Sequence, residues 1–217
     1  MDRFLAQSVE FMPILLMGVK LTILVTLGSL VVSTALGLIW ALMRVSGIRL
    51  LSAISRGIIN VIRGIPIIVQ LFYIYFVLPD FGITLSALQA AIIGLGIAYS
   101  AYQSENFRAG IEAIDHGQVE AAQSIGMGWG LMMRRVILPQ AVRIVLPPYG
   151  NTMIMMLKDS SQASTITVAE LALQGKLIAS ATFQNSTVFT LVALLYLTMS
   201  IPLILLVGWL EKHFGRK

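Results

Sequence analysis

What this 217-residue chain lacks excludes several classes of protein. It contains no cysteine, so neither a disulfide framework nor a thiolate metal site can form. Its two histidines, His116 and His213, stand far apart and show no metal-ligand spacing, so we expect no metal site. Charged residues make up only 12% of the chain, whereas a soluble domain carries about a quarter. Much of the surface must therefore face something other than water.

Patterns of catalytic residues are missing as well. The sequence has no G-x-x-x-x-G-K-S/T phosphate loop, so the chain does not carry the usual machinery for ATP hydrolysis. It also has no paired catalytic carboxylates, no histidine cluster and no nucleophile–base arrangement. We therefore expect a protein that is not an enzyme and that holds no cofactor.

Hydrophobic residues, 57% of the chain, gather in five long runs. These runs cover residues 19–43, 65–78, 85–104, 142–157 and 188–210, and the second can be extended back to residue 58. A helix needs about 20 residues to cross the hydrocarbon core, so we expect polar residues at the ends of the short second and fourth runs to be drawn in. The pattern predicts an all-α integral membrane protein with five transmembrane helices in a single domain, residues 1–217.

The distribution of Lys and Arg predicts the orientation, because these residues favour the cytoplasmic side. If the N-terminus lies outside and the C-terminus inside, eleven basic residues are cytoplasmic and four are not. The eleven are Arg44, Arg49, Arg56, Arg63, Arg108, Arg134, Arg135, Arg143, Lys212, Arg216 and Lys217, and the four are Arg3, Lys20, Lys158 and Lys176. The opposite orientation would invert this bias, so we predict an N-out, C-in topology.

One polar and basic segment, EAAQSIGMGWGLMMRRVILP at residues 120–139, interrupts the apolar runs on the predicted cytoplasmic side. A membrane protein exposes such a segment to water to meet something there. Asp115 lies ahead of a stretch that can form a short helix through Ile125. We expect three glycines to stop this helix, since glycine adopts left-handed backbone conformations at little cost. They are Gly126, Gly128 and Gly130.

The same segment resembles the EAA motif of the membrane subunits of ABC importers. The motif positions are Glu120, Ala121, Ala122, Gly126, Leu138 and Pro139. The resemblance implies a cytoplasmic coupling helix at about residues 115–130 that docks on a separate ATP-binding subunit, and the small alanines would let that partner approach closely. The coupling residues would be Gln118, Glu120, Ala121, Ala122, Ser124 and Gly126. The alternative is an ordinary amphipathic helix lying on the membrane surface.

Three further stretches are similar to one group within that family. NVIRGIP at 60–66, YSAYQSENFRAGI at 99–111 and KDSS at 158–161 resemble permeases for polar amino acids of the histidine, arginine and glutamine type. The resemblance spans essentially the whole chain. It implies the type I ABC importer fold and uptake of polar amino acids or close derivatives by alternating access across a bacterial inner membrane. Gln162 departs from the pattern, because the family commonly has Leu after KDSS, and this bears on which substrate is carried.

The resemblance also implies partners. A dimer of ATP-binding subunits would hydrolyse ATP, and a periplasmic or extracellular solute-binding protein would deliver the amino-acid substrate. Five spans are few to enclose a path, so we expect a second copy of the chain or a homologous permease chain. The outer surface would contact membrane lipid, and we expect no nucleic-acid partner.

Charges near the membrane interior are costly and are therefore candidates for substrate contacts. Glu105 and Arg108 stand at positions i and i+3, close enough to pair. Glu105 could meet a substrate ammonium and Arg108 a carboxylate, or the two could form a structural ion pair at the cytoplasmic interface. Arg63 precedes Pro66, and we interpret it as an interfacial anchor in the turn where a helix begins.

A dense polar patch follows the fourth apolar run. It consists of Lys158, Asp159, Ser160, Ser161 and Gln162. Asp159 could accept a hydrogen bond from the ammonium of a zwitterionic amino acid, and the serine and glutamine side chains could donate to its carboxylate. Glu170 is a further acceptor candidate. The alternative is a solvated outer loop.

A secondary transporter or small channel that works without a motor is the competing interpretation. It would explain the hydrophobicity and the charges near the membrane, but it would leave the EAA-like segment without a role.

Overall fold

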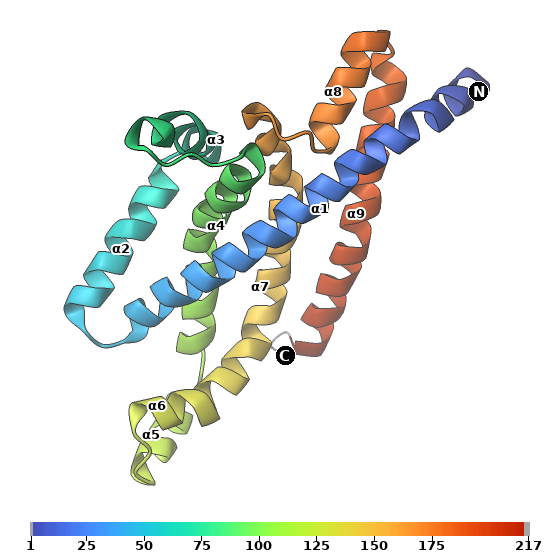
Figure 1. Cartoon of the computed structure of the whole chain (residues 1–217). Coiled ribbons are helices and arrows are strands. Elements are labelled where there is room, and N and C mark those ends of the chain that lie inside the picture. Colours follow the sequence, from blue (N-terminus) through green and yellow to red (C-terminus); the bar gives the residue numbers. More distant parts are fainter. Residues whose placement is uncertain (1, 215–217) are drawn as a thin grey trace.

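The computed structural model describes residues 2–214, which form helices and short connections without a β-strand. Five long helices run alternately between the two ends of the molecule, so that the start of α1 and the last turn of α9 lie at opposite ends (Figure 1). They are α1 (Asp2–Val45), α2 (Arg49–Gly64), α4 (Ala87–Glu112), α7 (Leu138–Asp159) and α9 (Asn185–Phe214). The predicted all-α membrane fold is confirmed.

Hydropathy alone identifies only some of these helices as membrane spans. Among the described residues, α1 from Ala6 onward and α9 are long and apolar enough to cross, and α2 with the bent segment after it counts as a third. The helices α4 and α7 carry more polar residues. On α4 these include Ser100, Gln103 and Ser104, which are buried within the protein. Polar side chains that face other helices rather than lipid are tolerated at membrane depth.

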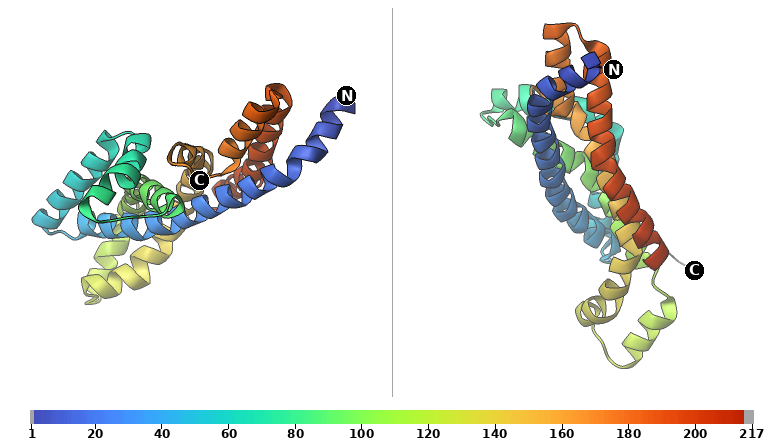
Figure 2. Two further views of the ribbon diagram at one scale, coloured as in Figure 1. Left: turned by 45° about the horizontal axis from the view of Figure 1, so that its top comes forward. Right: turned by 90° about the vertical axis from the view of Figure 1, so that its right-hand side faces the viewer.

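The long helix α1 crosses α4 and α7 obliquely (Figure 1, Figure 2). Glycines at the α1–α4 crossing let the backbones approach closely, as is common between membrane helices. A Cβ atom at Gly96 would stand 2.5 Å from a methyl group of Val32, and one at Gly37 would stand 2.8 Å from the Cβ of Gln103. Larger residues at these two positions would push the helices apart.

The second predicted span is broken, and its predicted extent was wrong. The helix α2 ends at Gly64, and the following segment, α3 (Ile67–Phe72), turns away at 97°. A π-helical turn η1 (Tyr73–Val77) and a 3-10 turn η2 (Leu78–Phe81) continue α3. The break lies before Pro66 because a residue that precedes proline is disfavoured in the α conformation; Ile65 is extended, with ψ at 127°. The candidate for the second span is therefore the bent pair as a whole, which begins at the polar residue Arg49.

Two short helices project beyond the end of the molecule at which α9 finishes (Figure 1, Figure 2). They are α5 (His116–Ser124) and α6 (Trp129–Met132), and a π-helical turn η3 (Met133–Ile137) leads into α7. The Asp115 carboxylate caps α5 by accepting from the Gly117 N–H at 2.7 Å. Gly126 follows α5 with φ at +78°, as predicted.

The prediction for the other two glycines was wrong. Gly128 precedes the first residue of α6 as its N-cap, and Gly130 lies inside α6. Both have backbone conformations open to any residue, so of these three glycines Gly126 alone has a backbone geometry that favours glycine.

The opposite end of the molecule is formed by the chain between α7 and α9. A 3-10 helix η4 (Ser160–Ile166) follows α7, and α8 (Leu171–Thr182) forms an antiparallel hairpin with the first half of α9 (Figure 1). Leu15 of α1, Leu171 of α8 and Val188 of α9 are fully buried together in this region. The hairpin is therefore anchored to the start of α1.

Candidate functional site

A polar pocket of about 330 Å³ lies between the end of α2 and the middle parts of α4 and α7. It is lined by Arg63, Tyr102, Glu105, Asn106, Pro148, Asn151, Thr152 and Met155. The helices α4 and α7 start at opposite ends of the molecule, so residues 102–106 and 148–155 lie well inside the helical body (Figure 1). The pocket therefore places polar groups at membrane depth.

Arg63 stands at the outer end of α2 and reaches into this pocket, so its predicted cytoplasmic position was wrong: α2 begins at Arg49 and carries Arg63 to the end of the molecule opposite α5 (Figure 1). Its guanidinium carbon lies 5.4 Å from the centroid of the Tyr102 ring, the geometry of a cation–π contact. None of the ion pairs among the described residues involves Arg63. A guanidinium without a carboxylate partner in a membrane protein is available to an anionic ligand group.

Glu105 lies between two guanidinium groups. Arg44 of α1 contacts one carboxylate oxygen at 3.0 Å, and Arg108 contacts the other at 2.7 Å. Arg108 also pairs with Glu112 one turn further along α4. The predicted Glu105–Arg108 pair is confirmed, and Arg44 is an addition that joins α1 to α4. Both oxygens of Glu105 already accept from arginine, so its negative charge is balanced inside the protein.

Asn106 joins α4 to α7 at the floor of the pocket. Its amide nitrogen donates to the side-chain oxygen of Gln103 at 3.1 Å and to the Thr152 hydroxyl at 3.0 Å. Thr152 donates in turn to the Pro148 carbonyl at 3.0 Å. The side-chain oxygen of Asn106 accepts no hydrogen bond from the described residues, so it is an open acceptor in the pocket that Arg63 also lines.

The predicted polar patch stands at the end of α7 and is separate from this pocket. The Tyr99 hydroxyl donates to Asp159 at 2.6 Å and so links α4 to α7. Ser160 is fully buried and donates to the Leu157 carbonyl, and Ser161 donates to the Lys158 carbonyl. Gln162 is half-buried and makes no side-chain hydrogen bond to the described residues. Asp159 and Glu105 thus belong to two different levels of the helical body.

Glu170 lies in a third place, fully buried at the start of α8. Its carboxylate accepts from the backbone N–H groups of Ala172 and Leu173, each at 2.9 Å. It also accepts from the Tyr196 hydroxyl at 2.7 Å and from the Thr22 hydroxyl at 3.5 Å. These contacts are those of a helix N-cap, and they tie α8 to α1 and α9.

The candidate coupling residues lie on the projecting α5 helix or, for Gly126, directly after it, and most of them are exposed. The exposed ones are Gln118, Glu120, Ala121, Ser124 and Gly126. Ala122 is only 4% exposed, because it packs against Met132, Ile137 and their neighbours beneath α5. Two large apolar side chains are open beside this surface, Ile125 at 73% and Trp129 at 51% exposure. Exposed apolar side chains rimmed by polar ones are typical of protein interfaces.

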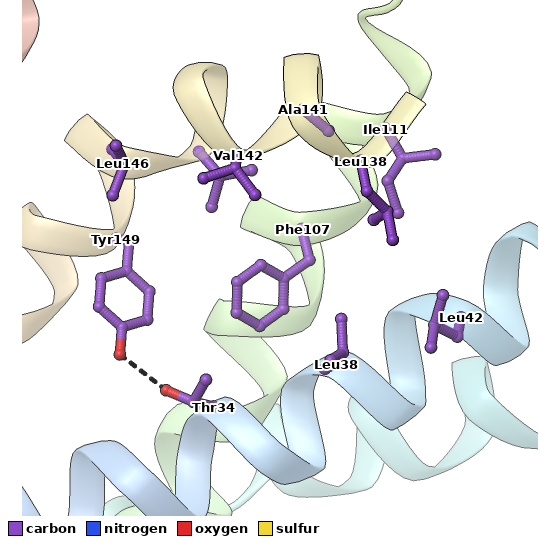
Figure 3. Close-up of a pocket in the computed structure, with 11 residues that line it drawn as sticks. Thr34, Leu38, Leu42, Phe107, Ile111, Leu138, Ala141, Val142, Leu146 and Tyr149 are labelled. Atoms are coloured by element: carbon purple, nitrogen blue, oxygen red, sulfur yellow. Dashed lines mark hydrogen bonds between the residues drawn. The ribbon is translucent and has the colours of Figure 1, made fainter. Parts of the chain in front are cut away.

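The structure also contains an apolar groove of about 420 Å³ between α1, α4 and α7 (Figure 3). Its lining includes Leu38, Phe107 and Val142, and no charged side chain is among the residues that form it. Its polar contact is the hydrogen bond between Tyr149 and Thr34, at 2.8 Å (Figure 3). A charged or zwitterionic ligand would find no partners in this groove beyond these two hydroxyls.

Sequence reasoning missed several residues of the polar pocket. They are Arg63, Tyr102, Asn106, Asn151 and Thr152. The signal was present for Arg63, since a charge beside an apolar run is a candidate for function. The interpretation of Arg63 as an interfacial anchor in the turn where a helix begins hid it, because such an anchor would face water rather than a pocket among the helices.

Comparisons with known proteins point in one direction. A family model described as "Binding-protein-dependent transport system inner membrane component" matches residues 33–216. The "Probable amino-acid ABC transporter permease protein YckA" of Bacillus subtilis (strain 168) is 37% identical over 208 residues, which cover 96% of this chain and 92% of that protein. The chain of a crystal structure of an amino acid ABC transporter with histidines is 38% identical, with a TM-score of 0.89 over 97% of this chain and 98% of that one. The inward-facing MetNI methionine ABC transporter shares the fold at 22% identity, with a TM-score of 0.78, 95% of this chain and 99% of that chain covered.

Proposed function

Because the chain belongs to the family of binding-protein-dependent transport system inner membrane components, we propose that its polar pocket and its projecting α5 helix are the two working parts of an ATP-driven uptake system for polar amino acids. The chain is the permease subunit of an ABC importer and is placed in the bacterial inner membrane. It is a transport subunit rather than an enzyme. One observation carries the proposal. The helices α4 and α7 line a pocket with charged residues at membrane depth, and the segment that connects these two helices carries the exposed helix α5 beyond the membrane.

The coupling surface supports an ATP-binding partner. Gln118, Glu120, Ala121 and Ser124 form an exposed polar face, and Ile125 and Trp129 beside it offer apolar anchors. Tryptophan is enriched among the residues that dominate binding energy at interfaces. A dimer of ATP-binding subunits would receive one such surface from each of two permease copies, or from this chain and a homologous one. A solute-binding protein would dock at the opposite end, where α8 and α9 form their hairpin.

Two levels of polar groups are available to a zwitterionic substrate on its way through the membrane. At the end of α7, Asp159 can accept from an ammonium group, while Ser160, Ser161 and Gln162 lie next to it along the chain. In the pocket below, Arg63 can donate to a carboxylate, and the open oxygen of Asn106 can accept. A zwitterion needs such partners because its charges are costly to desolvate.

Glu105, Arg108 and Glu170 have different parts in this proposal. Glu105 and Arg108, held in the arginine network, set the charge of the pocket wall on the side that leads toward α5. Glu170 was a candidate substrate contact, but its observed partners are structural, and we assign it the role of a cap on α8. Substrate contact by Glu105 or Arg108 requires that the ion pairs open.

Alternating access links the two working parts. When ATP draws the ATP-binding subunits together, the coupling helices of the two permeases would move together and open the pathway outward. Hydrolysis and release would reset it inward. A transporter or channel without a motor would have no use for the exposed surface on α5, and the relatives are permeases of ABC transporters.

Reconstitution with the cognate ATP-binding subunit and binding protein tests the proposal. We expect uptake of one or more of L-glutamine, L-arginine and L-histidine into proteoliposomes to require ATP and to vanish when the ATP-binding subunit carries an inactivated phosphate loop. Uptake that continued with the inactivated subunit would instead favour a transporter without a motor.

A further inference from the structure

One side chain joins the two arms of the broken span. The amide nitrogen of Gln70, on α3, donates to the carbonyl oxygens of Ile62 and Ile65, each at 2.8 Å. The backbone N–H of Gln70 also donates to the Pro66 carbonyl at 3.1 Å. Because Ile62 belongs to the last turn of α2, these bonds hold the outer end of α2 to the start of α3 across the 97° bend.

The two carbonyls need such a donor. The last four carbonyls of an α-helix have no partner within the helix, and the proline after the break supplies no N–H. Non-helical backbone at membrane depth persists only where the freed groups find partners in the protein or in water. A neutral carboxamide presents two N–H donors on one nitrogen, so Gln70 satisfies both carbonyls at once.

The same bend determines where Arg63 lies. Arg63 follows Ile62 directly, and its guanidinium reaches the polar pocket over the Tyr102 ring. A change in the angle between α2 and α3 would move the last turn of α2 and carry Arg63 with it. We propose that Gln70 is a positioning residue for this pocket, because it clamps the break and thereby holds Arg63 over Tyr102. This inference rests on the proposed passage of substrate through the pocket.

A distance measurement tests the clamp without a ligand. The natural absence of cysteine allows spin labels at Val61→Cys on α2 and Val69→Cys on α3, which are 63% and 47% exposed. In the assembled complex in lipid nanodiscs we expect one narrow distance distribution. Gln70→Leu should shift or broaden it. Gln89→Leu is the matched control, since Gln89 also bonds to backbone, accepting from the Ser86 N–H at 3.0 Å, but at the start of α4 and away from the break.

A double-variant comparison tests the link to transport, with L-glutamine and L-arginine as probes. We expect Arg63→Gln and Gln70→Leu each to lower uptake per ATP hydrolysed by about tenfold, the scale of two lost hydrogen bonds. The double variant should be no worse than Arg63→Gln alone, because Gln70 acts through Arg63. Gln70→Glu, which donates no hydrogen bond when ionised, should share the defect and replaces Gln70→Leu if that variant fails to insert.

The outcomes separate the two ideas. An unchanged distance distribution in both Gln70 variants, or losses of uptake that add in the double variant, would overturn the positioning role. Full uptake by Arg63→Gln would instead overturn the proposed role of the pocket, and the spin-label distances would still show whether Gln70 holds the bend.

Discussion

Glu105 and Glu170 are both carboxylates among membrane helices, yet their surroundings differ in every respect that matters. Glu105 has a side chain that is 29% exposed, lines a pocket and is flanked by two guanidinium groups. Glu170 is fully buried, and its partners are two backbone N–H groups and two hydroxyls. Charge at membrane depth is a pointer to function by default. The comparison shows that a charged residue at membrane depth should be assigned a function only when its access to a pocket and the kind of its partners are known.

The arrangement around each carboxylate also explains how its charge is tolerated. Glu105 is neutralised by cations that bring two helices together, so part of the network can open toward the pocket. Glu170 is held by neutral donors fixed in three helices, and nothing in that cluster can leave without stranding a buried polar group. We therefore expect the pocket region to respond to a ligand and the Glu170 region to stay closed.

The largest expected effect is on the closed side of the comparison. Glu170→Ala would leave the N–H groups of Ala172 and Leu173 and the Tyr196 hydroxyl without an acceptor in the protein interior. We expect a loss of roughly 3–5 kcal/mol in the free energy of unfolding and a fall in Tm of about 10 °C. Thermal unfolding of the detergent-solubilised complex measures this. Glu170→Gln keeps an acceptor oxygen, so its Tm should lie between those of the unchanged protein and of Glu170→Ala. An unchanged Tm in both variants would refute the role of Glu170 as a cap.

The next effect is confined to function and concerns the coupling surface. Gly126→Leu would force a branched side chain into a left-handed backbone conformation, with φ at +78°, on the face that we propose meets the ATP-binding subunit. We expect uptake to fall by about tenfold or more, on the scale of a strained residue of 1–3 kcal/mol, while the membrane helices keep their Tm. Gly126→Asn should retain more uptake, because Asn tolerates this conformation. Equal uptake by all three chains would remove Gly126 from the coupling surface.

Asp159 lies between the two extremes and sharpens the comparison. It is half-buried and accepts one hydrogen bond, from the Tyr99 hydroxyl at 2.6 Å. Asp159→Asn keeps the shape and removes the charge, so we expect uptake to weaken by about tenfold or more, the scale of one charged hydrogen bond, with assembly intact. Tyr99→Phe instead removes the hydrogen bond between residues 99 and 159 and leaves the charge of Asp159. If both variants lose Tm and neither loses uptake, Asp159 belongs with Glu170 as a structural group.

The smallest expected effect is on Glu105. Glu105→Gln removes the negative charge that pairs with both Arg44 and Arg108. All three side chains are partly exposed, and ion pairs of this kind contribute about 0–1 kcal/mol to stability. We therefore expect a nearly unchanged Tm and a few-fold change in uptake, measured with L-glutamine and L-arginine side by side. A loss of stability as large as that of Glu170→Ala would break the contrast between the two carboxylates.

How much of the fold the sequence predicts depends on the range of the interactions involved. The first and fifth spans follow from uninterrupted apolar runs, and the short helix ended by Gly126 follows from local backbone preference. The second span does not, because Ile65 and Pro66 separate a helix that starts at Arg49 from one that turns aside. The apolar run continues through the bend, and hydropathy carries no information on the direction in which the backbone runs.

The sequence by itself thus determined that this chain is a membrane protein without a recognisable pattern of catalytic residues, and it predicted one cytoplasmic segment that would meet a partner. Composition, charge bias and motif spacing are properties of the linear chain, so they survive without coordinates. Only the tertiary structure decided that Arg63 reaches a pocket, that Ala122 is buried beneath α5 and that Glu170 caps α8. Each of these depends on which helices pack together, because a polar side chain becomes a site or a cap through neighbours that are distant in sequence.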